Sequence, residues 1–243
     1  MYKGRRVSLI LPTYREKDSI RQVIHDFEQL GIVDEIIVIN NNAIEGTSEE
    51  VRQTSAIEIH EPVQGYGAAI QRGFAESQGD LIAVCEPDGT FVAADLHKFL
   101  AYVEDVDIVY GSRTIKTFIW ERANMGLLLK WGNWFVAKLL EVLFNTSYLS
   151  DVGCTYRIIR REALLKLLPT FQVKSNFFGP EMMVRGYRMK LRCVQIPINY
   201  KERTGQSSVT GYLRKTLVLG TQMLVLIIAM RFGLERYLLR LLK

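Results

Sequence analysis

Two acidic residues at the end of an apolar run are the side chains of this sequence best suited to chemistry. Residues 80–85 have the length and apolar character of a buried strand, and Glu86 and Asp88 follow on a Glu-Pro-Asp-Gly turn. Open α/β sheets bind ligands at the edge to which their strands deliver their carboxyl ends. Two carboxylates on a tight turn at that edge suit Mg²⁺ or Mn²⁺, which such sites share with substrate phosphates. A solvated β-turn is the alternative interpretation.

Two arginines could supply the opposite charge. Arg113 follows the apolar run 107–110 in a Gly-Ser-Arg sequence, and Arg203 opens a polar loop that extends to residue 208. A planar guanidinium matches the oxygens of a phosphate with two parallel hydrogen bonds. Both arginines are therefore candidates for binding anions, although an arginine of unknown position is more often a solvated surface residue.

The elements that must position these residues alternate along the first half of the chain. Apolar runs of strand length are separated by segments in which apolar residues have helical spacing. We expect strands at 6–11, 35–39, 56–60, 80–85 and 107–110, and helices at 18–30, from 48, at 67–77 and at 94–103. This alternation predicts an α/β fold with a mostly parallel central sheet and helices on both faces.

The second half of the chain contains longer helices. Residues 125–144 form an apolar helix that carries Trp131 and Trp134, and a helix at 181–189 precedes a strand at 191–200. In the tail, the apolar run 217–230 is shorter than the roughly 20 residues of a membrane-spanning helix. Residues 232–243 alternate leucines with basic residues, as in an amphipathic helix that lies in a bilayer surface. Packing on the protein or on a second copy is the alternative.

The composition indicates a folded protein of a reducing compartment. The chain has 243 residues, 48% hydrophobic and 23% charged, which is enough for one large domain or a domain with an appendage. Its three cysteines are scattered and odd in number, which argues against a disulfide framework or a zinc site. The apolar run before Pro12 is too short for a signal peptide. The net charge of +5 is compatible with several anionic partners and selects none.

Seven short motifs follow one another in this chain. They are residues 11–16 (Leu-Pro-Thr-Tyr-Arg-Glu), 40–47, 65–69 (Gly-Tyr-Gly-Ala-Ala), 86–88, 111–113, 151–157 and 197–208. Their order resembles that of family 2 glycosyltransferases with the GT-A fold, in particular the polyprenyl-phosphate glycosyltransferases such as dolichyl-phosphate mannose synthase. The resemblance covers residues 7–208 and rests on the order of the motifs, since no single motif is decisive.

The resemblance implies a site for a UDP- or GDP-sugar donor. It places eight residues beside the nucleotide: Pro12, Thr13, Tyr14, Glu16, Asn41, Gly67, Glu86 and Arg203. At Asn41 the family usually has an aspartate that accepts a hydrogen bond from the base. Asparagine keeps an acceptor and adds donors, so the choice between UDP and GDP stays open. Gly67 would let a helix N-terminus approach the nucleotide, and close packing of the helix start explains it equally well.

The resemblance also assigns Glu86 and Asp88 to the position at which the family binds its metal ion. Glu86 replaces the usual first aspartate and keeps its charge, and Asp88 is the expected direct ligand. A divalent cation, Mg²⁺ or Mn²⁺, would stabilise the charge that grows on the diphosphate as the sugar–phosphate bond breaks.

On the acceptor side, the resemblance implies that Arg113 binds the acceptor phosphate, with Lys130 a weaker candidate. Asp151 stands where some members have a catalytic base. A polyprenyl phosphate is already an anion near neutral pH and scarcely needs deprotonation. Contact with the sugar, or a buried pair with Arg157, is therefore as plausible as catalysis by Asp151. The lysine that often follows Ser208 in the family is replaced by Val209.

We therefore expect an inverting enzyme that moves a hexose to a polyprenyl (dolichyl or undecaprenyl) phosphate at the cytoplasmic face of a membrane. The expected organisation is a GT-A domain over 1–210, with a nucleotide-binding half to 113 and an acceptor half from 114, followed by membrane-associating helices at 211–243. The alternatives are a soluble or polysaccharide acceptor, or a non-catalytic nucleotide-sugar-binding protein. No basic stripe interleaved with aromatic residues indicates nucleic-acid binding, and a homo-oligomer is left open.

Overall fold

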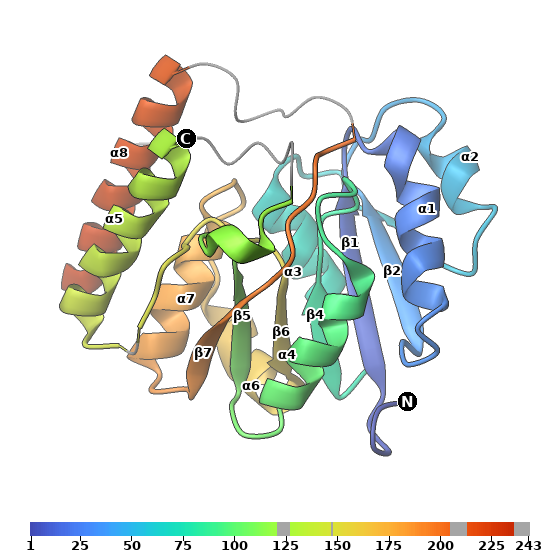
Figure 1. The fold of residues 1–243 in the computed structure, drawn as a ribbon, viewed down its shortest axis with the longest axis horizontal. Helices are drawn as coiled ribbons and strands as arrows, with labels where there is room; N and C mark the ends of the chain where they lie inside the picture. Colours follow the sequence, from blue (N-terminus) through green and yellow to red (C-terminus); the bar gives the residue numbers. More distant parts are fainter. Residues whose placement is uncertain (121–126, 147, 205–212, 236–243) are drawn as a thin grey trace.

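The computed structural model describes residues 1–120, 127–146, 148–204 and 213–235. Within them, one seven-stranded sheet has the order β3-β2-β1-β4-β6-β5-β7 (Figure 1). The strands are β1 (Val7–Thr13), β2 (Glu35–Asn40), β3 (Ile57–His60), β4 (Leu81–Val84), β5 (Ile108–Ser112), β6 (Arg157–Arg160) and β7 (Cys193–Pro197). β6 is antiparallel to its neighbours β4 and β5, and the other neighbouring strands are parallel. The predicted α/β fold with a mostly parallel sheet is confirmed.

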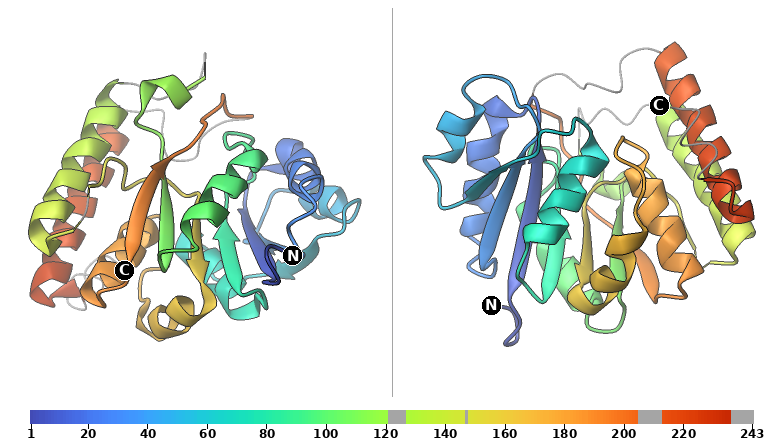
Figure 2. Two further views of the ribbon diagram at one scale, coloured as in Figure 1. Left: turned by 60° about the horizontal axis from the view of Figure 1, so that its bottom comes forward. Right: turned by 180° about the vertical axis from the view of Figure 1, so that it is seen from behind.

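Helices cover both faces of the sheet (Figures 1 and 2). They are α1 (Lys17–Glu28), α2 (Thr47–Val51), α3 (Tyr66–Glu76), α4 (Leu96–Tyr102), α5 (Leu127–Phe144), α6 (Arg161–Leu167), α7 (Phe178–Arg188) and α8 (Leu213–Phe232). One buried cluster joins the sheet to α1 and α4 through residues such as Ile24 and Phe99. A second cluster, which includes Phe74 and Met182, joins the opposite face to α3, α6 and α7. Because both faces are covered, β1 and β4 consist entirely of buried residues.

Helices α5 and α8 extend the second cluster beyond α7. α5 and α8 pack against each other and against α7, at the β7 end of the molecule (Figures 1 and 2). Residues 236–243, which belong to the second helical stretch predicted in the tail, lie outside the described residues. None of the described helices is long and apolar enough to cross a membrane.

The boundaries of several elements differ from those predicted. The first helix, predicted from residue 18, begins at Lys17, and the cap residue Glu16 accepts the N–H groups of Ser19 and Ile20 with its backbone carbonyl and not with its side chain. Helix α6 was not predicted. The strand expected at 191–200 ends at Pro197, because the chain then leaves the sheet and Lys201 donates its backbone N–H to the carbonyl of Thr90 (2.7 Å).

Candidate active site

The candidate site lies at the edge of the sheet where β1, β4 and β5 end. β1 and β4 are parallel, and β5 has the same direction because both β4 and β5 are antiparallel to β6. β1 delivers Thr13 and Glu16 to this edge, β4 delivers Glu86 and Asp88, and β5 delivers Arg113. The sheet therefore brings acidic and basic candidates from distant parts of the chain to one edge, as the sequence predicts.

Asp88 is buried, and both of its oxygens have partners. Oδ1 accepts hydrogen bonds from the backbone N–H (3.0 Å) and the hydroxyl (2.6 Å) of Thr90, which fixes the turn after β4. Oδ2 lies 3.3 Å from Nη1 of Arg203. Nη2 of the same arginine lies 3.3 Å from Oε1 of Glu16. Arg203 thus bridges two carboxylates at the position predicted for a cation.

The segment around Arg203 is fastened to the acidic turn by its backbone. Thr204 donates its N–H to the carbonyl of Asp88 (3.0 Å), and a Cβ added to Gly89 would lie 3.0 Å from the Thr204 hydroxyl. Gly89 has φ +78°, a conformation that side chains other than glycine rarely adopt. The Pro-Asp-Gly turn therefore positions Asp88, and its glycine leaves room for Thr204 to pack against it.

Glu86 is partly exposed and lies beside Asp88. The partial burial of its carboxyl group raises the pKa of Glu86 to about 8, and the negative charges of Asp88 and Glu16 contribute to that rise. The positive charges of Arg203 and Arg113 act in the opposite direction. The carboxyl groups of Glu86 and Asp88 are hard oxygen donors on one turn, and this donor type fits Mg²⁺ or Mn²⁺. Among the described residues there is no group of three or more His, Cys, Asp or Glu placed to hold a metal.

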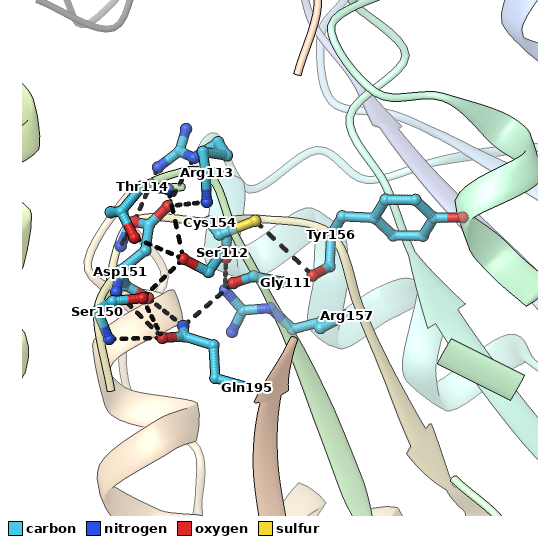
Figure 3. Close-up of polar contacts among 11 residues, drawn as sticks. Gly111, Ser112, Arg113, Thr114, Ser150, Asp151, Cys154, Tyr156, Arg157 and Gln195 are labelled. Atoms are coloured by element: carbon cyan, nitrogen blue, oxygen red, sulfur yellow. Dashed lines mark hydrogen bonds and ion pairs between the residues drawn. The ribbon is translucent and has the colours of Figure 1, made fainter. Parts of the chain in front are cut away.

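Arg113 and Asp151 form the other half of the site (Figure 3). Asp151 Oδ2 accepts hydrogen bonds from the backbone N–H (3.0 Å) and from Nε (2.9 Å) of Arg113, and Oδ1 accepts from Nη2 (3.1 Å). Gly153 donates its N–H to Oδ1 as well (2.9 Å). Burial alone would raise the pKa of Asp151, but the charge and hydrogen bonds of Arg113 outweigh it and hold the pKa below its ordinary value.

The predicted pair of Asp151 with Arg157 is wrong. Arg157 is buried on β6, where its guanidinium donates to the carbonyls of Cys154 and Gly179 and lies 5.6 Å from the ring of Tyr110. Asp151 instead pairs with Arg113, which donates hydrogen bonds from both its backbone N–H and its guanidinium. Glu181, on α7, is a buried acid with a structural role, because it accepts the N–H groups of residues 172 and 173 and pairs with Arg185.

Asn41 is buried with its hydrogen-bonding capacity filled. Its Nδ2 donates to the carbonyls of Glu61 and Val63 (both 2.8 Å), and its Oδ1 accepts from Gly65 N–H (2.8 Å) and Gln64 Nε2 (3.1 Å). In this structure Asn41 shapes the loop before α3. Its contact with a base stays a prediction, and a base would have to replace one of these bonds.

For two further candidates, Gly67 and Lys130, the structure gives a position but does not test the predicted role. A Cβ added to Gly67 would lie 2.5 Å from the Val173 carbonyl, so close packing by itself requires glycine there. Lys130 lies partly exposed in the first turns of α5. One turn further along α5 is Asn133, whose Oδ1 would be 2.9 Å from a Cβ on Gly153; Arg113 Nη2 would be 3.1 Å from the same atom. α5 therefore reaches the Arg113 side of the site.

A separate cavity of about 370 Å³ is not part of this arrangement. It lies along α3 and is lined by Glu61, Val63, Ala68, Gln71, Arg72, Ala75, Leu168 and Lys174. None of the predicted site residues lines it. The convergence of charged side chains at the strand ends is the stronger indication of a reaction site.

Comparison with known proteins agrees with this geometry. A family model described as glycosyl transferase family 2 matches residues 8–168. The chain is 25% identical to a dolichyl-phosphate hexose transferase of Haloferax volcanii, over 85% of this chain and 87% of that protein. It is also 25% identical to an undecaprenyl-phosphate mannosyltransferase of Micrococcus luteus, over 85% of this chain and 88% of the relative.

The fold resembles that of a crystal structure of glucosyl-3-phosphoglycerate synthase from Mycobacterium tuberculosis in complex with phosphoglyceric acid. The TM-score is 0.73 at 18% identity, and the match covers 95% of this chain and 81% of that one. Further structures of that synthase contain Mn²⁺ and UDP. Since the family model covers more than half of the chain, the chain belongs to glycosyl transferase family 2 and is a hexosyltransferase with a GT-A fold.

Proposed function

We propose that the enzyme transfers a hexose from a nucleoside diphosphate sugar to a polyprenyl phosphate. The observation that carries the proposal is the placement of an arginine held by a buried carboxylate, Arg113, at the same sheet edge as the acidic pair Glu86 and Asp88. One half of the site suits a cation shared with the donor diphosphate, and the other suits an acceptor phosphate. The names of the Haloferax and Micrococcus relatives support a lipid-linked acceptor.

On the donor side, Glu86 and Asp88 would hold the divalent cation. When bound, Mg²⁺ or Mn²⁺ neutralises the charge that develops on the departing diphosphate. Mn²⁺ and UDP in structures of the mycobacterial synthase support this assignment. Arg203 pairs with Asp88 and Glu16 in the structure. Its guanidinium would exchange these carboxylates for diphosphate oxygens when the donor binds. The other donor-side candidates, Pro12, Thr13, Tyr14, Asn41 and Gly67, remain part of the proposal.

On the acceptor side, Arg113 would bind the phosphate and align its oxygen for attack on the anomeric carbon. The phosphate is ionised near neutral pH, so the step needs orientation more than a base. Asp151 already accepts four hydrogen bonds and has a lowered pKa, which supports a role in holding Arg113 rather than in removing a proton. Lys130 and Asn133, on α5, would approach the same phosphate.

The surface of α5 and α8 supports an approach to a membrane. Both helices expose large apolar side chains: Trp131, Trp134, Phe135 and Val142 on α5, and Val218, Val225, Ile228 and Phe232 on α8. Lys138 lies beside Trp134 and Tyr148, with its Nζ 5.9 Å and 3.9 Å from the two rings. Exposed aromatic residues with nearby cations are typical of contacts with the interfacial region of a bilayer. We infer that this helix pair brings the Arg113 side to lipid.

The proposal is tested by the fate of a labelled sugar. The purified enzyme is incubated with UDP- or GDP-hexoses, Mn²⁺ and a polyprenyl phosphate in detergent. We expect label in the organic-extractable fraction, dependent on both the cation and the lipid phosphate. Transfer only to water-soluble acceptors would replace this proposal with a soluble-acceptor enzyme, for which the mycobacterial synthase bound to phosphoglyceric acid is the precedent.

A further inference from the structure

The loop that carries Asp151 is held by the side chain of Gln195, on β7 (Figure 3). Gln195 Oε1 accepts hydrogen bonds from the backbone N–H groups of Ser150 (2.7 Å) and Asp151 (3.1 Å), and from the Ser150 hydroxyl (3.2 Å). Its Nε2 donates to the carbonyls of Asp151 (2.6 Å) and Gly111 (3.1 Å). One carboxamide therefore ties this loop to the end of β5, two residues before Arg113.

The network requires a donor and an acceptor at one position. A carboxamide has both in a fixed plane. Here the two backbone N–H groups must face its oxygen and the two carbonyls must face its nitrogen, so the orientation of the amide is determined. An apolar side chain of similar size would leave the N–H groups of Ser150 and Asp151 without an acceptor. Since unpaired buried N–H groups are unfavourable, the loop would adopt another conformation.

Such a shift would reach Arg113 directly. The Asp151 carboxylate accepts hydrogen bonds from the backbone N–H, Nε and Nη2 of Arg113. A displacement of the loop would therefore displace the guanidinium. Tyr200, in the segment that follows β7, also contacts the Arg113 guanidinium, whose carbon lies 5.3 Å from the centre of the Tyr200 ring. Strand β7 and its continuation thus contact both the backbone of Asp151, through Gln195, and the Arg113 guanidinium, through Tyr200.

We propose that Gln195 is a positioning residue, which sets the orientation of Arg113 toward the acceptor phosphate by fixing the Asp151 loop. The kinetic part of this inference rests on the proposed function. The hydrogen bonds of Gln195 described above join it to residues 111, 150 and 151, which are not part of the acidic turn. Its effect should therefore fall on the acceptor and leave the donor side intact, which a general structural role would not do.

The kinetic test compares Gln195→Met with the wild-type enzyme. We expect the ratio of kcat to KM for the polyprenyl phosphate to fall about tenfold to a hundredfold, as for a displaced binding group. The dissociation constant for UDP or GDP with Mn²⁺, measured by calorimetry, should stay unchanged. Gln71→Met is the matched control, because Gln71 is also half-buried and bonds to the Val173 carbonyl and Lys174, away from the site.

A second readout is independent of turnover. In wild-type protein the Arg113 Nε–H is hydrogen-bonded to Asp151, so its proton NMR resonance should exchange slowly with water; an Arg113→Lys spectrum assigns it. We expect this resonance to shift and to exchange faster in Gln195→Met, and to be unaffected in Gln71→Met. If Gln195→Met does not fold, Gln195→Glu, which keeps the size and the acceptor oxygen, is examined by the same two readouts.

The outcomes separate this inference from the proposed function. Wild-type enzyme without transfer to any polyprenyl phosphate would overturn the proposed function, and the Arg113 resonance would still decide the role of Gln195. An unchanged resonance with unchanged acceptor kinetics in the folded variant would overturn the role of Gln195 alone. Equal losses for donor and acceptor would show a general structural effect, and would also overturn it.

Discussion

The two halves of the site satisfy their charges in opposite ways. Around the β4 turn, Glu86 is forced toward the neutral form, and Asp88 and Glu16 share one arginine from a segment that follows β7. At the end of β5, Asp151 is ionised, buried and hydrogen-bonded four times. The first half has one arginine for three carboxyl groups, whereas in the second the carboxylate and its arginine are fully paired within the protein. The comparison teaches that the half proposed to bind the donor is short of positive charge, whereas the half proposed to bind the acceptor has its buried carboxylate fully hydrogen-bonded.

Removing the charge of Asp88 should have the largest effect. Asp88→Asn keeps an oxygen for Thr90 and therefore the turn, but weakens the seat for the cation. We expect transfer to fall about a thousandfold, on the scale of lost transition-state electrostatics. The measurement is the rate of sugar transfer at saturating Mn²⁺. Full activity in this variant would show that the β4 turn holds no catalytic cation.

Breaking the Arg113 pair should affect stability as well as binding. Arg113→Met leaves the buried Asp151 carboxylate without its counter-charge, so we expect a loss of about 3–5 kcal/mol in the free energy of unfolding. The double variant with Asp151→Asn should recover most of that stability and none of the affinity for the acceptor phosphate. Denaturant titrations and acceptor KM values check this. Recovery of acceptor affinity in the double variant would contradict the role given to Arg113.

The pKa of Glu86 predicts a pH dependence confined to the donor half. Without a cation, the folded protein holds this proton up to about pH 8, whereas the unfolded chain loses it near 4.5, the ordinary pKa of a glutamate. The folded state therefore binds more protons in this window, and the free energy of unfolding should decrease as pH rises from about 4.5 to 8. Thermal unfolding of wild type and Glu86→Gln without divalent ions should differ in this slope. The same slope in both proteins would refute the shifted pKa.

The same proton should compete with the cation. Because Mn²⁺ needs the ionised carboxylate, its affinity should rise with pH up to about 8 and then level off. Glu86→Gln should bind more weakly and lose this dependence. Calorimetric titrations at several pH values measure it, and a wild-type affinity that is flat between pH 6 and about 8 would count against Glu86 as a ligand.

The smallest effect is expected at the surface of α5. Replacing the exposed Trp131 and Phe135 by serine removes apolar contact area without touching the core. We expect partition onto anionic lipid vesicles to fall several-fold, with thermal stability unchanged. Sedimentation with vesicles measures the partition. If the variant partitions as the wild type does, α5 does not face the bilayer.

The sequence predicts the donor half better than the acceptor half, for a physical reason. Glu86 and Asp88 follow an apolar strand and stand on a turn whose proline and glycine are evident, so local patterns locate them. The partner of Asp151 depends on which strand ends lie side by side, and Arg157, closer in sequence, is buried beside Tyr110 instead. Gln195 was missed because one polar residue in a short strand has no local signature. Helix α6 was missed because no side chain caps its start. The antiparallel direction of β6 could not be predicted from local sequence, because it depends on how the strands of the whole sheet pair.

The central claim is that the acidic turn seats a cation shared with the donor diphosphate, and manganese electron paramagnetic resonance tests it most directly. Adding the wild-type protein together with UDP or GDP should remove the signal of free Mn²⁺, and Asp88→Asn should leave most of it. Asp151→Asn, which alters only the acceptor half, should behave as the wild type does. Equal uptake of Mn²⁺ by wild type and Asp88→Asn in the presence of nucleotide would contradict the account.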